Sequence, residues 1–262
     1  MRRLSLGPAV PFPKLELPRD EVHVWASALC AEVGRNDLSP DLLSDDERRR
    51  SEGFTHPRDR ESFIFSRLFL RSVLSRYVGL FAQDIRLLET PLGKPVLGGQ
   101  RERSRLEFNL ADKRGFIVLA VASGRKVGID VAHLDSRLPW KEIAARFFSA
   151  LELKLVNDLT GDKRRKSFFR LWTIKEAYLK GRGEGIGWSL GSVRLSLPKK
   201  SGWVEEDFSC RVKRPSVWEI RTFNPAPEFI GAVAAEGTGW VLRPQQDPPT
   251  MSLGDRGYQA IP

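Results

Sequence analysis

The stretch FFRLWTIKEAYLKGRGEGIG, residues 168–187, combines an acid and two bases with a following run of glycines. Its mostly apolar residues predict a helix on which Trp172, Glu176 and Lys180, each four positions apart, share one face. The same spacing is typical of an ordinary surface ion pair, which stabilises a helix by only about 0.2–0.5 kcal/mol. Spacing alone therefore leaves two interpretations, an exposed ion pair or a site that binds a ligand.

A second acid interrupts an apolar run upstream. In VGIDVAHLD, residues 127–135, Asp130 lies inside a predicted strand, where aspartate is disfavoured unless it ends the strand or binds a ligand. Asp130 and Glu176 could together hold Mg²⁺, which prefers a few carboxylates completed by water and by phosphate oxygens of a substrate. Nearby lysines would meet the remaining phosphate charge, so the sequence predicts a magnesium and phosphate site.

Predicted strands and turns surround Asp130. Apolar patterning predicts strands at 21–29, 84–90, 105–110, 116–122 and 127–131. The PLGKP sequence that follows the second of these predicts a turn. Ser123, Gly124 and Arg125 predict a hairpin turn that joins the last two strands.

Helical segments recur in the same order along the chain. Capping boxes begin at Ser44 and Ser149, 105 positions apart (149 − 44), and each precedes a long apolar helix, the first of them expected at 57–77. The strand at 116–122 is echoed at 229–235, 113 positions later (229 − 116). This order predicts a duplicated unit of a short helix, a long helix and strands.

The repeat predicts a chain of two similar halves. We expect an irregular N-terminal lead-in at 1–20, an N-terminal half at 21–125, a C-terminal half at 126–242 and a disordered tail at 243–262, which is rich in Pro, Gln and Gly. A cleft between two similar halves is a natural ligand site, so we expect the site there.

The composition favours an anionic partner. The chain has 262 residues, 41% of them hydrophobic, which is enough for a sizeable core. Its 43 Lys and Arg outweigh 33 Asp and Glu, giving a net charge of +10. Such a charge favours a phosphorylated metabolite, an acidic protein, nucleic acid or a membrane surface, although it also serves plain solubility.

No segment predicts secretion or membrane insertion. Apolar runs such as FIVLAVA are too short to span a bilayer, and the proline-containing N-terminus lacks the apolar core of a signal peptide. Cys30 and Cys210 lie in strand-like stretches and are expected to be buried thiols rather than a disulfide or a metal site. We therefore expect a cytoplasmic protein.

The motifs together resemble those of the 4′-phosphopantetheinyl transferases. VGIDV, ARFFSALE and FFRLWTIKEAYLKGRGEGIG follow one another in the order and spacing of that superfamily. Upstream, LSDDERRRSEGF, HPRDRESFIFSRLFLRSVLSRYVGL and GKPVL resemble its large, pseudo-dimeric (Sfp-type) subgroup, so the resemblance covers about residues 21–241. It implies an α+β fold in which two similar α/β subdomains hold the ligand site in the cleft between them.

The resemblance also implies an activity. Such enzymes use Mg²⁺ and transfer the 4′-phosphopantetheine arm of coenzyme A to a serine of an apo acyl or peptidyl carrier protein, releasing 3′,5′-adenosine diphosphate. They serve polyketide, nonribosomal peptide or fatty acid biosynthesis, and the sequence leaves open which carrier is modified here. We expect a monomer that does not bind a membrane. We expect no nucleic acid as a partner either, since the sequence contains no nucleic-acid-binding motif.

Residue by residue, the resemblance makes Asp130 and Glu176 metal ligands and Lys180 the lysine that meets the coenzyme A pyrophosphate. It places Glu152 and Lys175 near the reacting centre, where either Glu152 or a metal-bound water would accept the serine proton. Glu152 is equally the second acid of its capping box, and this interpretation stays open.

Two further basic residues match positions that contact the nucleotide. Lys94, in GKP, matches a lysine that contacts the nucleotide portion of coenzyme A, and Arg50 falls where a basic residue often meets the 3′-phosphate. Turn solvation would explain Lys94 equally well, and an exposed helix face would explain Arg50.

The sequence departs from the family pattern in two motifs. Ala132 stands where the family has a second strand carboxylate, and Ala111 and Asp112 stand where it has the serine and histidine that contact phosphate. An acid beside a phosphate is repulsive unless a cation intervenes, and Lys113 is expected to point away from the site because neighbouring strand residues alternate. These departures leave three alternatives. Asp112 could replace the missing acid as a metal ligand, or coenzyme A could bind in a shifted pose. The chain could also be a degenerate member that binds coenzyme A or a carrier protein but is catalytically weak.

Overall fold

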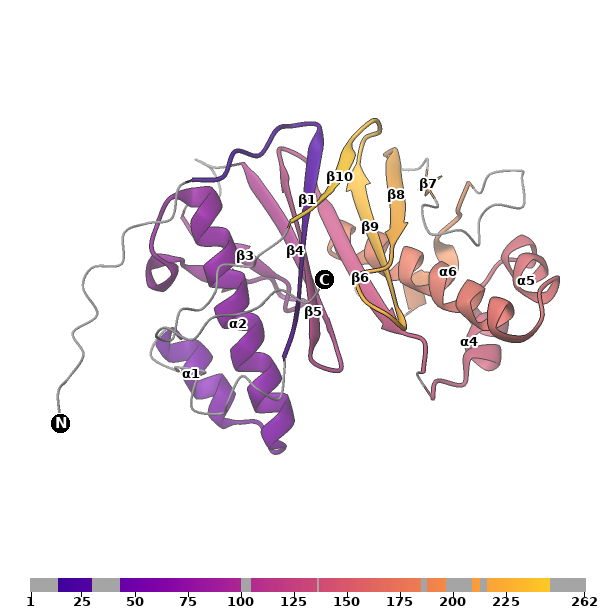
Figure 1. Ribbon diagram of the computed structural model, residues 1–262, viewed down its shortest axis with the longest axis horizontal. Helices are drawn as coiled ribbons and strands as arrows, with labels where there is room; N and C mark the ends of the chain where they lie inside the picture. Colours follow the sequence, from indigo (N-terminus) through magenta and orange to yellow (C-terminus); the bar gives the residue numbers. More distant parts are fainter. Residues whose placement is uncertain are drawn as a thin grey trace. The chain divides into compact units, whose positions relative to one another are not determined.

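The computed structural model describes residues 14–29, 43–99, 105–135, 137–184, 188–196, 209–212 and 216–245 (Figure 1). By packing, the chain divides into two compact units, one of residues 1–16, 29–85 and 246–262 and one of residues 17–28 and 86–245. The domain boundaries expected from the repeat remain a prediction. Among the helices in the described ranges, none combines the length and apolarity needed to cross a bilayer.

The first unit is built on two helices, α1 (Asp45–Glu52) and α2 (Pro57–Val78), followed by the short 3₁₀ helix η2 (Ala82–Asp84). α1 begins at the predicted capping box, in which Ser44 Oγ accepts the Glu47 N–H and Glu47 Oε2 accepts the Ser44 N–H. Glu47 also pairs with the buried guanidinium of Arg71, with 2.6 Å between Oε2 and Nη2. This pair links α1 to α2.

The second unit contains two four-stranded sheets. The first has the order β10-β1-β5-β4, in which β1 (Glu21–Ala28) pairs antiparallel with β5 (Phe116–Ser123) and parallel with β10 (Val241–Pro244). At its other edge, β5 pairs antiparallel with β4 (Leu106–Lys113). A separate small hairpin joins β2 (Leu87–Glu89) to β3 (Pro95–Leu97).

The second sheet has the order β6-β9-β8-β7 and is antiparallel throughout. Its strands are β6 (Val127–His133), β9 (Phe229–Glu236), β8 (Trp218–Phe223) and β7 (Ser209–Val212). Helices α4 (Trp140–Phe147), α5 (Ala150–Asn157) and α6 (Gly161–Arg182) precede the 3₁₀ helix η3 (Trp188–Ser192). α6 lies along this sheet, beside β6 and β9 (Figure 1).

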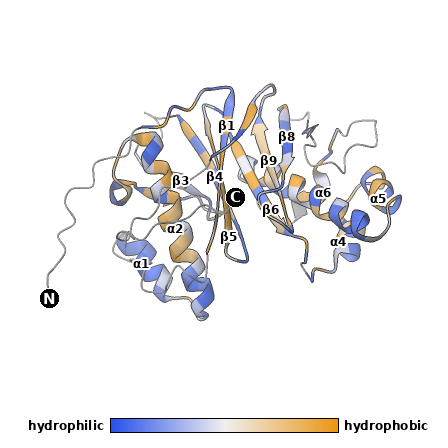
Figure 2. Ribbon diagram, in the orientation of Figure 1, coloured by the Kyte–Doolittle hydropathy of each residue, from blue (hydrophilic) through white to orange (hydrophobic). Residues whose placement is uncertain are grey.

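Alternation along β6 divides its side chains between two cores. Val127, Ile129 and Val131 pack with apolar residues of the first sheet, whereas Ala132 belongs to the core formed with α6. Strands β5 and β9 are also largely hydrophobic (Figure 2). Asp130 has the same parity as Ala132, so strand geometry aims its carboxylate toward α6.

The structure confirms the α+β fold class and several predicted elements. Both capping boxes form, and both long helices, each of 22 residues, end at a glycine in the left-handed conformation, Gly79 and Gly183. Cys210 is a buried free thiol, as expected, and burial raises its pKa. Cys30 lies outside the described residues.

The predicted hairpin at 123–125 is wrong. β5 pairs with β1 and β4, and β6 pairs with β9, so the turn carries the chain from one sheet into the other. Ser, Gly and Arg mark a turn through local conformation, but they do not determine which strand the next segment pairs with.

Candidate functional site

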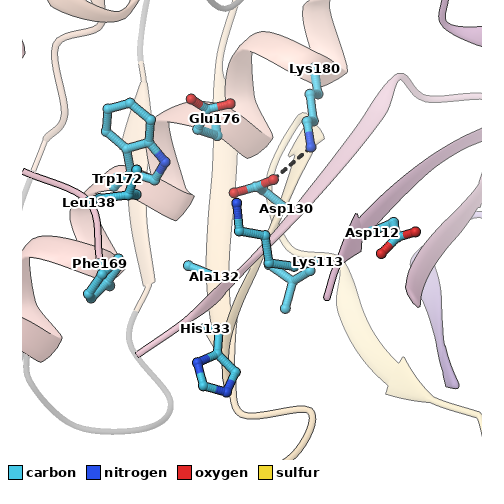
Figure 3. A pocket seen from close by; sticks show the side chains of 11 residues that line it. Asp112, Lys113, Asp130, Ala132, His133, Leu138, Phe169, Trp172, Glu176 and Lys180 are labelled. Atoms are coloured by element: carbon cyan, nitrogen blue, oxygen red, sulfur yellow. Dashed lines mark hydrogen bonds and ion pairs between the residues drawn. The ribbon is translucent and has the colours of Figure 1, made fainter. Parts of the chain in front are cut away.

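A cavity of about 270 Å³ lies where β4 of the first sheet faces β6 and α6. Figure 3 shows the side chains that line it. From the two strands come Asp112, Lys113, Asp130, Val131, Ala132 and His133, and from the following loop and α6 come Leu138, Phe169, Trp172, Glu176 and Lys180. Three residues expected from the sequence to act together, Asp130, Glu176 and Lys180, therefore face one cavity.

Two glycines allow α6 to approach β6 closely enough to build this cavity. A Cβ at Gly128 would lie 2.1 Å from Ala177 O and 2.2 Å from Gly181 N, both backbone atoms of α6. A Cβ at Gly181 would lie 2.6 Å from the ring of Trp218. Because neither position tolerates a side chain, the glycines fix the distance between the strand that carries Asp130 and the helix that carries Glu176 and Lys180.

Asp130 and Lys180 form an ion pair across this contact. Lys180 Nζ donates a hydrogen bond to Asp130 Oδ1 at 2.6 Å (Figure 3). The sequence suggested instead a pair between Glu176 and Lys180 on the surface of the helix, and this alternative is wrong. Lys180 turns from its own helix toward the strand, and Glu176 is left without that partner.

Glu176 is a buried carboxylate without a hydrogen-bond partner among the described residues. Its residue is only 4% exposed, and no described donor hydrogen-bonds or ion-pairs with its side chain. Burial, and next the negative charge of Asp130, raise the pKa of Glu176 to about 7, while Lys180 and Lys113 oppose that rise. A buried acid in this situation is costly to the fold unless a cation reaches it.

The pair Asp130 and Glu176 fits a magnesium ion. Within the described residues, no three or more His, Cys, Asp or Glu side chains gather in a way that could hold a metal. A closed, all-protein cage is therefore not formed there. Mg²⁺ is instead commonly held by one or two carboxylates, with water and substrate phosphates completing its coordination, and two inward-facing carboxylates match that donor set.

Glu152 and Lys175 form a buried ion pair of their own. Lys175 Nζ lies 2.8 Å from Glu152 Oε2, and both side chains are almost completely buried. Glu152 Oε2 also accepts the Ser149 N–H at 2.7 Å, and Lys175 donates to the Phe147 carbonyl at 3.1 Å. Burial lowers the pKa of Lys175, and Glu152 counteracts this.

This second pair connects α4 and α5 to α6 rather than lining the cavity. The capping-box interpretation of Glu152 is thus present in the structure. The part that Glu152 and Lys175 take near a reacting centre stays a prediction.

The predicted nucleotide contacts lie in different places. Lys94 Nζ donates to the Lys180 carbonyl at 3.2 Å, which places this lysine at the C-terminal end of α6. Arg50 belongs to the first unit, where its guanidinium lies 5.2 Å from the centre of the Phe63 ring. Ala111 is buried in the core between the two sheets.

Asp112 and Lys113 have the opposite orientation to the one expected. Asp112 Oδ1 accepts the Gly115 N–H in the turn between β4 and β5, and its carboxylate points away from Asp130, whereas the Lys113 ammonium points into the cavity (Figure 3). The prediction for Lys113 was therefore wrong. Strand parity places Lys113 on the same face as Ala111, but only the structure shows that this face packs toward β6.

His133 also lines the cavity and was not singled out in the sequence. Its Nδ1 accepts the Asp135 N–H at 3.0 Å and lies 3.2 Å from Arg114 Nη1. On the other side of the ring, Nε2 lies 3.7 Å from Glu228 Oε2.

Comparison with known proteins gives matches along most of the chain. Residues 126–230 match the 4′-phosphopantetheinyl transferase superfamily, and residues 36–124 match the family described as 4′-phosphopantetheinyl transferase, N-terminal. The 4′-phosphopantetheinyl transferase HetI of Nostoc sp. is 34% identical over 87% of this chain and 93% of its own length. The 4′-phosphopantetheinyl transferase Sfp of Bacillus subtilis is 27% identical over 76% of this chain and 85% of its own.

A human relative matches a shorter part. The L-aminoadipate-semialdehyde dehydrogenase-phosphopantetheinyl transferase of Homo sapiens is 26% identical over 59% of this chain and 53% of its own length.

Proposed function

Because this chain belongs to the 4′-phosphopantetheinyl transferase superfamily and is an enzyme of its Sfp-like type, we propose the following reaction. With Mg²⁺, it transfers the 4′-phosphopantetheine arm of coenzyme A to a serine hydroxyl of an apo acyl or peptidyl carrier protein. The serine oxygen forms a bond to the β-phosphorus and its proton passes to a general base. The bond from the β-phosphorus to the bridging pyrophosphate oxygen breaks, and 3′,5′-adenosine diphosphate leaves.

The single observation that carries this proposal is the carboxylate of Glu176, which lies beside Asp130 and has no hydrogen-bond partner among the described residues. A fold that buries an acid at 4% exposure with a pKa raised to about 7 bears a free-energy cost that a bound cation would remove. When bound there, Mg²⁺ would neutralise charge on the pyrophosphate. The cavity of about 270 Å³ is near the lower end of ligand sites, which suits a pyrophosphate with the rest of coenzyme A outside it.

The other residues of the cavity support the same chemistry. Lys180 holds its ammonium at the cavity, 2.6 Å from Asp130, where it can meet an anionic substrate. Charge on the phosphate oxygens and on the leaving group grows during the transfer, so fixed positive groups there lower the barrier. The hydrogen bond from Lys94 to the carbonyl of Lys180 supports a role for this lysine in extending the positive region toward the nucleotide.

The buried pair of Glu152 and Lys175 favours a positioning role for both residues. Each already has charge-compensating and backbone partners, and neither lines the cavity. In this proposal they hold α4 and α5 against α6. The net charge of +10 favours association with an acidic carrier protein.

The experiment is a carrier modification assay. The protein is incubated with MgCl₂, coenzyme A and several apo carrier proteins, and each carrier is weighed by mass spectrometry. We expect a gain of one phosphopantetheine group for wild type and none for Asp130→Ala. Coenzyme A binding without modification of any carrier would instead support the degenerate alternative, which the departures at Asp112 and Ala132 motivate.

A further inference from the structure

Lys113 lies at the last position of β4 and extends its ammonium into the cavity. Its side chain points toward Asp130, while the carboxylate of its neighbour Asp112 points the other way (Figure 3). Among the described residues, no acceptor hydrogen-bonds or ion-pairs with the Lys113 ammonium. A lysine that faces a polar cavity without an acceptor is available to an anionic ligand.

The inward-facing charges of the cavity balance. Asp130 and Glu176 supply two acids, and Lys113 and Lys180 supply two bases, since the carboxylate of Asp112 is turned away. At position 132, where the family pattern has another acid, an alanine lines the cavity instead. An acid there would leave the cavity net negative and repel a pyrophosphate unless a metal ion were present.

The residues at positions 132 and 113 therefore change the charge of the cavity in the same direction. Ala132 removes a negative charge from the cavity, and Lys113 adds a positive one on the facing strand. Asp112, which looked repulsive to a phosphate in the sequence, instead accepts the Gly115 N–H in a turn.

We propose that Lys113 binds the pyrophosphate of coenzyme A together with Lys180, and that these two lysines allow the protein to bind coenzyme A without metal. The inference rests on the proposed function. It adds a phosphate-binding residue at a position where the resemblance assigned none, and it assigns Lys113 to the pyrophosphate rather than to the 3′-phosphate.

The test is calorimetric binding of coenzyme A in EDTA. We expect Lys113→Gln to raise the dissociation constant about tenfold, the loss typical of one charge-assisted hydrogen bond, and Lys113→Arg to retain most of the affinity. The matched control is Lys126→Gln, which removes the same charge from an exposed lysine outside the cavity lining and should change the constant less than about twofold.

Two ligands locate the contact. Dephospho-coenzyme A keeps the pyrophosphate and lacks the 3′-phosphate, so the tenfold effect of Lys113→Gln should persist. The product 3′,5′-adenosine diphosphate keeps the 3′-phosphate but only one of the two pyrophosphate phosphates, so the effect should become much smaller. The reverse pattern would overturn the assignment, because it would place Lys113 at the 3′-phosphate.

Failure of this inference is distinct from failure of the proposed function. Equal binding by wild type and Lys113→Gln, or no binding by wild type in EDTA, overturns the inference. If wild type still modifies a carrier in MgCl₂, the proposed function stands. If no carrier gains mass, the proposed function fails whatever Lys113 does.

Discussion

Replacing Glu176 by glutamine should stabilise the metal-free protein. The side chain keeps its shape and loses a charge that, among the described residues, nothing pairs with. In the folded state the pKa of this acid is about 7, against an ordinary value of 4.5. The folded protein thus holds the proton more tightly than the unfolded chain does.

The sign and size of the effect follow from that difference. Loss of the proton begins to cost stability as the pH rises above 4.5, and the full cost applies above about 7. The gap corresponds to roughly 3 kcal/mol. The glutamine amide is also polar and buried, so we expect a net gain of about 1–3 kcal/mol, or roughly 3–10 °C in Tm.

The assay is thermal and urea unfolding in EDTA at about pH 5 and about pH 8. The stabilisation by Glu176→Gln should be large at the higher pH and much smaller at the lower one. Adding MgCl₂ should stabilise wild type more than the variant, because the variant lacks one of the two carboxylates of the proposed ion site.

Glu219→Gln is the matched control. Glu219 is also buried, but its carboxylate accepts hydrogen bonds from Arg221 at 3.2 Å and from the Gly239 N–H at 2.9 Å. The same substitution should therefore lower stability. A Glu176→Gln protein that is less stable than wild type at about pH 8 without metal, or whose advantage is the same at both pH values, would refute the reasoning.

Three further changes test the rest of the site. Gly128→Ala should lower the unfolding free energy measured in urea by about 3 kcal/mol or more, because its Cβ would lie 2.1 Å from a backbone oxygen of α6. As a control, Gly191→Ala should lower it by less than about 1 kcal/mol, because no neighbouring atom lies within 4 Å of that Cβ. Glu152→Gln should lower the unfolding free energy by about 3–5 kcal/mol, because it leaves the buried charge of Lys175 without its partner. Adding Lys175→Met should recover part of this loss. Loss of transfer with normal stability would instead identify Glu152 as the base. Ala132→Glu should make coenzyme A binding, followed by calorimetry, depend more steeply on MgCl₂, and an unchanged titration would show that position 132 does not reach the bound ligand.

The sequence allowed prediction of the acids but not of all their neighbours. Asp130 stood out because strands disfavour aspartate, and Glu176 because it shares a helix face with Lys180; both line the cavity. The orientation of Lys113 was mispredicted because alternation tells which residues share a face, not which face meets the ligand. The turn at 123–125 was mispredicted as a hairpin because turn chemistry is local and strand pairing is not.

The glycines show why position and chemistry in this site are inseparable. Gly128 precedes Asp130 by two residues on β6, and Gly181 follows Lys180 directly on α6, so each glycine lies within two residues of a charged residue of the cavity. Their close approach brings Asp130 within 2.6 Å of Lys180, and it leaves Glu176 at the same cavity without a described partner. At these glycines, neighbouring atoms fill the space that a Cβ would need. Any shift of α6 away from β6 would therefore move Glu176 and Lys180 away from Asp130. The geometry that makes the site costly to the metal-free fold is therefore the same geometry on which the proposed binding of one ion by its two carboxylates depends.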